Sequence, residues 1–247
     1  MSVLRDITAA FGWLSIVPVW AEASARPARW FPLVGWLFGG VAAVLAYAAR
    51  LPGPGPLGSA LAGGVVVAVW AALSRLLHWD GVADTADGLL GGHSPEQRLE
   101  IMHDSRTGAF GASAIVIGML LQTLALGALI ASGDIWPLLA APVLGRLAAT
   151  CGLWTIAPAR SEGLAALLSV SEGPLARLIA LALLAPLLLL GVTPARAGIL
   201  CVGLLGALLV PRALARPVEG ISGDLLGASV VIVETLVLVA AALVTGV

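Results

Sequence analysis

The run LLGASVVIVETLVLVAAALVTG, residues 225–246, decides the fold, because it is apolar for the length of a membrane crossing and contains one charged residue, Glu234. About 20 helical residues at a rise of 1.5 Å cross a hydrocarbon core roughly 30 Å thick. Further runs of the same character occupy residues 32–50, 57–77, 108–131, 135–157, 175–192 and 197–210. The sequence therefore predicts an all-α polytopic membrane protein with about seven transmembrane helices, in one domain over residues 1–247. The run 197–210 is the shortest, and the first fourteen residues are expected to form an interfacial helix.

Composition agrees with a membrane protein. Hydrophobic residues make up 60% of the chain and charged residues 11%, and the mean hydropathy is +1.03. A net charge of −1 provides no field that would attract nucleic acid, so a nucleic-acid partner is not expected. Two cysteines predict neither a disulfide framework nor a zinc site.

The arginines fall mainly on one side of the predicted helices. Loops on one side contain Arg5, Arg26, Arg29, Arg75, Arg98, Arg106, Arg160, Arg177, Arg212 and Arg216, whereas the other side has Arg50 and Arg196. Positively charged short loops stay in the cytoplasm, so the first side is predicted to be cytoplasmic and the C-terminus external, in the bacterial inner membrane. The acidic residues Asp80, Asp84, Asp87, Glu96, Glu100, Asp104 and Asp224 share the arginine-rich side, and Asp134 is the acid on the other. This distribution favours an enzyme acting on a cytoplasmic substrate over a transporter, which would distribute polar groups along a path through the bilayer.

Two charges of opposite sign fall near the middle of predicted spans. Arg146 and Glu234 have similar depth by residue count. An unpaired charge there costs at least roughly 3 kcal/mol, so an ion pair is the simplest interpretation. The alternative is that both side chains line a substrate cavity.

The segment HWDGVADTADGLLGG, residues 78–92, contains a group of acidic residues that are candidates for metal binding. Asp80, Asp84 and Asp87 are spaced i, i+4 and i+7, which places them on one face of a helix. Like charges so close need a cation, and oxygen ligands without thiolates favour Mg²⁺, which commonly binds substrate phosphates as well. Gly81 and Gly88 would let a phosphate approach the backbone. The alternative is a solvated group of acids that caps a helix.

A second acidic segment follows at SPEQRLEIMHDSRTG. Ser94 is a good N-cap with proline next to it, and Glu96, Glu100 and Asp104 recur every four residues before Arg106. The pattern predicts either a second half of the metal site with a phosphate-binding arginine, or an ordinary surface helix with Glu–Arg pairs.

Two families resemble these motifs. DTADG at 84–88, followed by acids at four-residue spacing, partly resembles the CDP-alcohol phosphotransferases. A closer resemblance is to the cobalamin synthase family, the adenosylcobinamide-GDP ribazoletransferases. It rests on HWDGVADTADG (78–88), RLEIMHDSRTGAFGA (98–112) and SGDLLGAS (222–229), with SIVPVW (15–20) and FPLVGWLFGG (31–40) in matching order.

The cobalamin synthase resemblance implies an integral membrane, Mg²⁺-dependent enzyme. Its reaction joins adenosylcobinamide-GDP to α-ribazole or α-ribazole 5′-phosphate and releases GMP. We expect the metal ligands to be Asp80, Asp84, Asp87 and Glu100. The expected catalytic residues are Asp104 as general base, Arg106 on a phosphate oxygen, and His103 as a weaker candidate. Substrate contacts are expected from His78, Gly81, Gly88, Ser105, Arg146 and Asp224, although Asp224 has a helix N-cap as its alternative role. A homo-oligomer is possible within this scheme.

The rival functions differ in acceptor or in class. A CDP-alcohol or prenyl-diphosphate type of transferase would use the same metal chemistry with a lipid acceptor. A cation transporter would need acids on both membrane faces and in several spans, which this sequence lacks.

Overall fold

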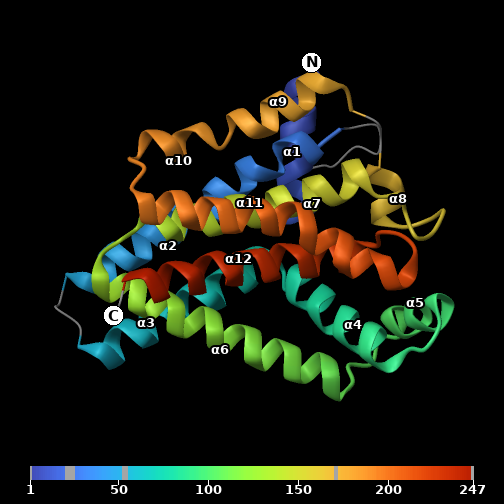
Figure 1. Ribbon diagram of the computed structural model, residues 1–247, viewed down its shortest axis with the longest axis horizontal. Helices are drawn as coiled ribbons and strands as arrows, with labels where there is room; N and C mark the ends of the chain where they lie inside the picture. The colour runs from blue at the N-terminus through green and yellow to red at the C-terminus, as the bar shows by residue number, and fades with distance from the viewer. Residues whose placement is uncertain (1, 20–25, 52–54, 170–171, 246–247) are drawn as a thin grey trace.

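The computed structural model describes residues 2–19, 26–51, 55–169 and 172–245, and these ranges are almost entirely helical (Figure 1). The helices are α1 Ser2–Leu14, η1 Ala28–Trp30, α2 Phe31–Arg50, α3 Pro56–Leu73, α4 Leu77–Gly91, α5 Pro95–His103, α6 Ala109–Ser132, α7 Trp136–Thr155, α8 Leu164–Leu168, α9 Pro174–Ala182, α10 Ala185–Leu189, α11 Pro194–Ala215, η2 Arg216–Val218 and α12 Gly223–Thr245. No strand occurs in these ranges. The prediction of an all-α polytopic membrane protein is confirmed.

Six helical stretches are long and apolar enough to cross a membrane: Ala28–Arg50, Pro56–Leu73, Ala109–Ser132, Trp136–Thr155, Pro194–Val218 and Gly223–Thr245. The predicted run 175–192 is instead a shorter apolar stretch, Pro174–Leu189. It is broken into α9 and α10, because Pro186 lacks the N–H that would continue the first helix and stands at the start of the second. The run 197–210 is shorter than the helix that contains it, because α11 extends from Pro194 through Pro211 to Ala215. The last predicted run, 225–246, ends one residue beyond the described range.

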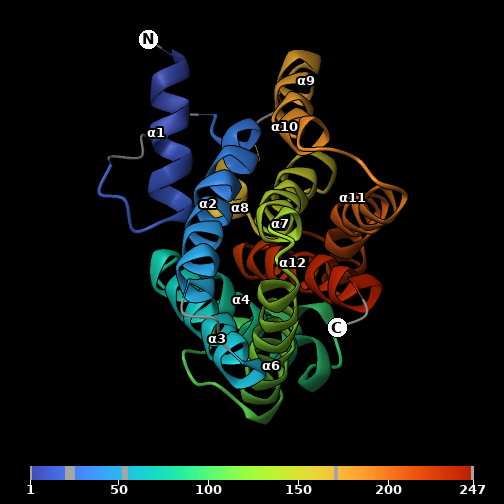
Figure 2. The same ribbon diagram turned by 90° about the vertical axis from the view of Figure 1, so that its left-hand side faces the viewer.

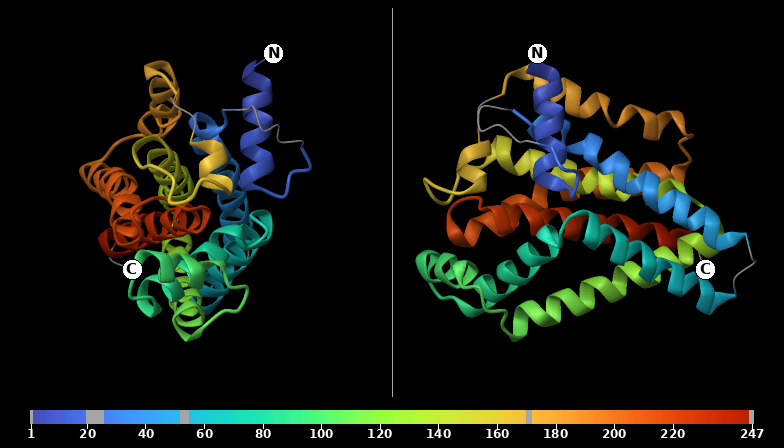
Figure 3. Two further views of the ribbon diagram at one scale, coloured as in Figure 1. Left: turned by 90° about the vertical axis from the view of Figure 1, so that its right-hand side faces the viewer. Right: turned by 180° about the vertical axis from the view of Figure 1, so that it is seen from behind.

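The long helices run side by side, with α2, α11 and α12 around α7, and with α3 and α6 packed against each other. Helices α2, α11 and α12 all pack against α7, most of whose side chains are buried. Small residues allow close approach: a Cβ added to Gly35 of α2 would lie 2.6 Å from the Pro142 carbonyl oxygen. The outer surfaces expose leucine and valine side chains, as a lipid-facing surface requires. Helix α1 runs across the bundle direction (Figures 2 and 3), the orientation expected of an interfacial helix.

The predicted Arg146–Glu234 pair is confirmed. Arg146 of α7 donates a hydrogen bond to Glu234 of α12, and their side chains are 1% and 6% exposed. The guanidinium carbon lies 4.0 Å from the centre of the Phe38 ring, which adds a cation–π contact. Arg146 is not among the residues that line the cavity described below, so the structure adds no support to its expected contact with substrate.

Helices α4 and α5 lie at one end of the bundle, next to α8 and the start of α12, whereas α12 ends at the opposite end (Figure 1). Helix α4 packs against α12, α6 and α5. A Cβ added to Gly81 would lie 2.6 Å from the Asp224 carbonyl oxygen, and one added to Gly88 would lie 2.8 Å from the Arg98 carbonyl oxygen. Both glycines are therefore needed for helix packing. Neighbouring helices occupy the space beside Gly81 and Gly88, so the structure gives no support to the phosphate contacts expected there.

Candidate functional site

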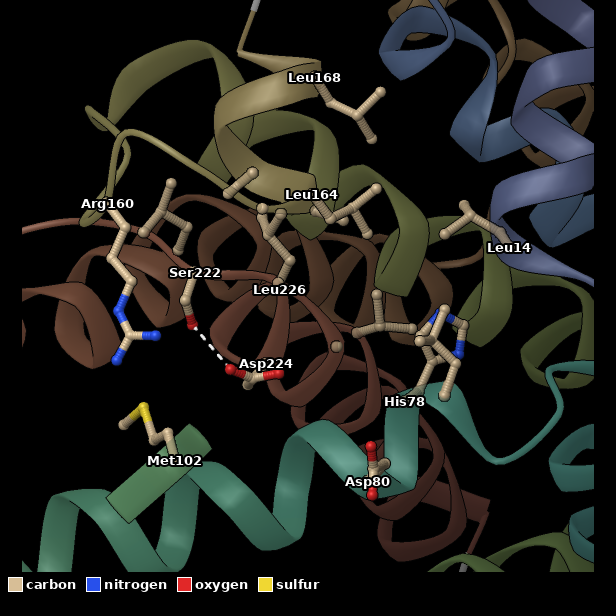
Figure 4. A pocket seen from close by; sticks show the side chains of 18 of the residues that line it. Leu14, His78, Asp80, Met102, Arg160, Leu164, Leu168, Ser222, Asp224 and Leu226 are labelled. Carbon is tan, nitrogen blue, oxygen red and sulfur yellow. Dashed lines mark hydrogen bonds between the residues drawn. The ribbon is translucent and has the colours of Figure 1, made fainter. Parts of the chain in front are cut away.

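A cavity of about 550 Å³ opens at the α4–α5 end of the bundle (Figure 4). Its polar lining comes from His78, Asp80, His103, Arg160, Glu162, Ser222 and Asp224. Its apolar lining includes Leu14, Phe31, Ala149, Leu164, Leu168 and Val230. The volume lies within the range of small-molecule sites, roughly 300–1,000 Å³. In Figure 4, Arg160 and Asp224 lie toward one side, with His78 and Leu14 toward the other.

The three aspartates of α4 lie on one helix, as predicted, but in different surroundings. Asp80 is exposed and lines the cavity, whereas the half-buried Asp84 and the buried Asp87 lie farther along α4 and do not line it. The pKa of Asp84 is raised from 3.8 to about 7, first by burial and then by the charges of Asp80, Asp224 and Asp87. Within the described ranges, neither Asp80 nor Asp84 forms an ion pair. The acidic face is thus electrostatically unfavourable until a cation reaches it.

Asp87 has a structural role that the spacing did not predict. Its two carboxylate oxygens accept hydrogen bonds from the backbone N–H groups of Gly108, at 2.7 Å, and Gly111, at 2.9 Å. These residues begin α6, where backbone N–H groups lack partners within the helix and the helix dipole favours a negative charge. Asp87 therefore fixes the start of α6 against α4.

Asp224 joins the α4 acids from a distant part of the sequence. The N-cap of α12 is Ser222, whose hydroxyl accepts a hydrogen bond from the Leu225 N–H at 3.2 Å. The same hydroxyl lies 3.4 Å from the Asp224 carboxylate. The Asp224 side chain is thus free of the capping role and lines the cavity.

The second acidic segment contributes less than expected. Ser94 caps α5 as predicted, accepting a hydrogen bond from the Gln97 N–H at 3.2 Å, and Glu100 is exposed on this helix. Asp104 lies one residue beyond the end of α5 with extended backbone, so it does not continue the helical face of Glu100. Neither acid lines the cavity, and the exposed Ser105 does not line it either.

Arg106 and Asp104 pair with each other. The Arg106 Nε lies 3.0 Å from one Asp104 carboxylate oxygen and 3.1 Å from the other. This hydrogen bonding lowers the pKa of Asp104 to about 2. A carboxylate with so low a pKa is a weak proton acceptor, so the expected general-base role is disfavoured. The Arg106 side chain is 87% exposed, and it does not line the cavity.

The two histidines of the site differ in environment. His78 is 4% exposed, and its Nε2 is buried without a hydrogen-bond partner in the described ranges. Burial, and then the charge of Arg146, lowers the pKa of His78 well below its usual value, so the ring is neutral. His103, at the end of α5, is exposed and lines the cavity.

Arg160 and Glu162 are cavity residues that the sequence analysis did not select. They follow α7 in a loop between α7 and α8. The Arg160 guanidinium donates a hydrogen bond to the Leu99 carbonyl at 2.6 Å, which anchors this loop to α5. The sequence places both residues on the arginine-rich side of the predicted helices. That position alone does not predict that they line this cavity.

The acidic cluster fits a divalent cation in donor chemistry. Asp80, Asp84 and Asp224 supply carboxylate oxygens only, the ligands that Mg²⁺ prefers. Within the described residues, no three acidic, histidine or cysteine side chains already converge as a preformed metal cage. Mg²⁺ commonly uses one or two protein carboxylates together with water and substrate phosphates, so this arrangement suits a cation bound with a diphosphate.

Comparisons with known proteins identify the family of the chain. The family model described as "Cobalamin-5-phosphate synthase" matches residues 6–242. A protein of Syntrophobacter fumaroxidans named adenosylcobinamide-GDP ribazoletransferase is 40% identical, covering 88% of this chain and 87% of its own length. Proteins with the same name are 38% identical in Ralstonia pickettii, covering 96% of both chains, and 39% identical in Deinococcus radiodurans, covering 87% of this chain and 74% of the relative. No solved structure matches the chain.

Proposed function

The chain belongs to the cobalamin-5-phosphate synthase family, and from this premise we propose that it joins adenosylcobinamide-GDP to α-ribazole or its 5′-phosphate in a Mg²⁺-dependent reaction. The acceptor's ribose hydroxyl oxygen attacks the phosphorus that carries the corrinoid arm. A new P–O bond to the acceptor completes a phosphodiester. The bond from the same phosphorus to the bridging oxygen of the diphosphate breaks, and GMP leaves with that oxygen. The hydroxyl proton passes to a base.

The observation that carries the proposal is the unpaired acidic cluster beside the cavity. Among the described residues, Asp80 and Asp84 form no ion pair, and the pKa of Asp84 is raised to about 7 by burial and neighbouring acids. One or two of the carboxylates of Asp80, Asp84 and Asp224 would hold Mg²⁺ together with the diphosphate, and a bound Mg²⁺ would neutralise charge on the diphosphate and on departing GMP. Of the four predicted metal ligands, Asp80 and Asp84 are retained in this scheme, and Asp224 replaces Asp87 and Glu100.

The other cavity residues position the reactants. Arg160 is close enough for its charge to act on Asp224, and a guanidinium at this place would hold a phosphate oxygen of the donor. His103 lines the cavity and would accept the proton of the ribose hydroxyl, a transfer for which histidine is the commonest side chain. Asp87 acts indirectly by holding α6 against α4.

The site would face the cytoplasm of a bacterium, at the inner membrane. The loops at the α4–α5 end contain most of the arginines, among them Arg98, Arg106 and Arg160, and arginine-rich loops stay on the cytoplasmic side. The C-terminal end of α12 would then be external. This placement gives the cavity access to a cytoplasmic nucleotide-activated corrinoid.

Release of GMP tests the proposal directly. Purified full-length protein in detergent, with adenosylcobinamide-GDP, α-ribazole and Mg²⁺, should release GMP and form a corrinoid product that contains ribazole. Chelation of Mg²⁺ should stop release, and Asp84→Asn should abolish it. Glu96→Gln, which changes an exposed carboxylate on α5, should not. Turnover with a lipid alcohol and CDP-activated donor, but none with the corrinoid, would overturn the proposal in favour of a CDP-alcohol type of transferase.

A further inference from the structure

Much of the cavity lining is apolar, and His78 adds one buried polar atom that has no hydrogen-bond partner among the described residues. Leu14, Phe31, Leu164 and Leu168 line the cavity with His78. The Nε2 of His78 is buried and makes no hydrogen bond with any described residue. A buried nitrogen without a partner is costly, so a ligand that supplies one partner atom among apolar surroundings would remove that cost.

We propose that this apolar lining binds the benzimidazole base of the acceptor nucleoside, with His78 Nε2–H donating a hydrogen bond to the base's free ring nitrogen. The inference rests on the proposed function. The ribazole base is a methylated bicyclic ring with apolar faces and edges, and it has one ring nitrogen free to accept a hydrogen bond. Its chemistry matches the apolar lining together with the buried Nε2 of His78.

The arrangement also orients the reacting end of the acceptor. His78 and Asp80 lie two residues apart at the start of α4, and both line the cavity. A base held at His78 therefore directs its ribose toward Asp80 and Asp224, where the activated diphosphate would bind. The corrinoid is far too large for a cavity of about 550 Å³ that already contains a nucleoside, so its macrocycle would stay outside.

The apolar lining should also decide which bases are accepted. A purine base presents an exocyclic amino group and additional ring nitrogens. Against leucine and phenylalanine side chains these polar groups would lose their hydrogen bonds to water without replacement. His78 is in this sense a specificity-determining residue rather than a catalytic one.

Paired acceptors test the hydrogen bond without depending on how well a variant folds. The nucleoside of dimethylbenzimidazole is compared with that of dimethylindole, in which a C–H group replaces the free ring nitrogen. The parent enzyme should prefer the benzimidazole nucleoside roughly tenfold in kcat/KM, the value of about one hydrogen bond. His78→Phe should reduce this preference to nearly one, leaving the KM for adenosylcobinamide-GDP unchanged.

Two further variants complete the test. His78→Gln places an N–H donor near the former Nε2 and should restore part of the preference, and His93→Gln, at an exposed histidine, should leave it intact. A full preference retained in His78→Phe, or a raised KM for the corrinoid donor alone, would overturn the inference. If the parent protein releases no GMP with either acceptor, the proposed function itself fails. This outcome differs from failure of the inference about His78, in which the parent protein still releases GMP.

Discussion

Replacing Asp84 with Asn should stabilise the protein when divalent cations are absent. The folded chain binds the Asp84 proton more tightly than the unfolded chain does, because burial and then Asp80, Asp224 and Asp87 raise its pKa to about 7. Ionisation of Asp84 therefore destabilises the fold above about pH 7. The effect weakens as the pH falls from 7 toward 4 and disappears once the carboxyl is protonated in both states.

The size of this effect follows from the pKa. A rise from 3.8 to about 7 corresponds to at most about 4 kcal/mol. Because Asp84 is only half-buried, solvent screening reduces the expected gain in the free energy of unfolding to about 1–2 kcal/mol. For a chain of this size, that gain raises Tm by roughly 2–8 °C.

Thermal unfolding in detergent at about pH 8 and about pH 5, with and without Mg²⁺, measures the effect. Without Mg²⁺ at the higher pH, Asp84→Asn should unfold above the parent, and the difference should shrink at the lower pH. Mg²⁺ at about 100 times its Kd should stabilise the parent by about 2.7 kcal/mol and the variant much less. Glu96→Gln should behave as the parent. The reasoning is refuted if Asp84→Asn unfolds below the parent without Mg²⁺, or if Mg²⁺ stabilises both equally.

Three more predictions follow from the same contacts. Asp87→Ala removes the acceptor for two N–H groups at the start of α6 and should lower the free energy of unfolding by about 2 kcal/mol; a metal-binding role would instead raise the half-saturating Mg²⁺ concentration of the remaining activity. Arg146→Met leaves Glu234 buried without its partner and should cost about 3–5 kcal/mol in thermal unfolding, whereas adding Glu234→Leu should recover most of it; equal loss in both variants would contradict the pairing. Arg160→Ala should raise the KM for adenosylcobinamide-GDP about tenfold or more, while Arg106→Ala, outside the cavity, should change it less than about twofold; the reverse order would return the phosphate to Arg106.

Local periodicity predicted the helices of the site well. The i, i+4, i+7 spacing of the α4 aspartates and the Ser94 cap of α5 both correspond to helices in the structure. These signals succeed because they depend on the backbone within one segment. The error at residues 175–192 has a local cause as well: the hydropathy of the run concealed the helix break before Pro186.

The acidic cluster could be predicted only in part, because spacing does not say which helix lies opposite. Asp87 shares a face with Asp84, yet the free N–H groups at the start of α6 take both of its carboxylate oxygens. Asp224 and Arg160 come from other segments, and packing brings them beside α4. No pattern in the sequence distinguishes a carboxylate that caps a neighbouring helix from one that is left for a cation.

The sequence by itself predicted an all-α membrane protein and, as one of two alternatives, the pairing of Arg146 with Glu234. Both follow from the bilayer as a solvent, which requires long apolar helices and does not tolerate an isolated charge. The tertiary structure alone decided where the cavity lies, which acids form no ion pair and that His78 Nε2 makes no hydrogen bond among the described residues. These properties depend on contacts between distant segments, and such contacts are set by how whole helices pack rather than by the order of residues within any one of them.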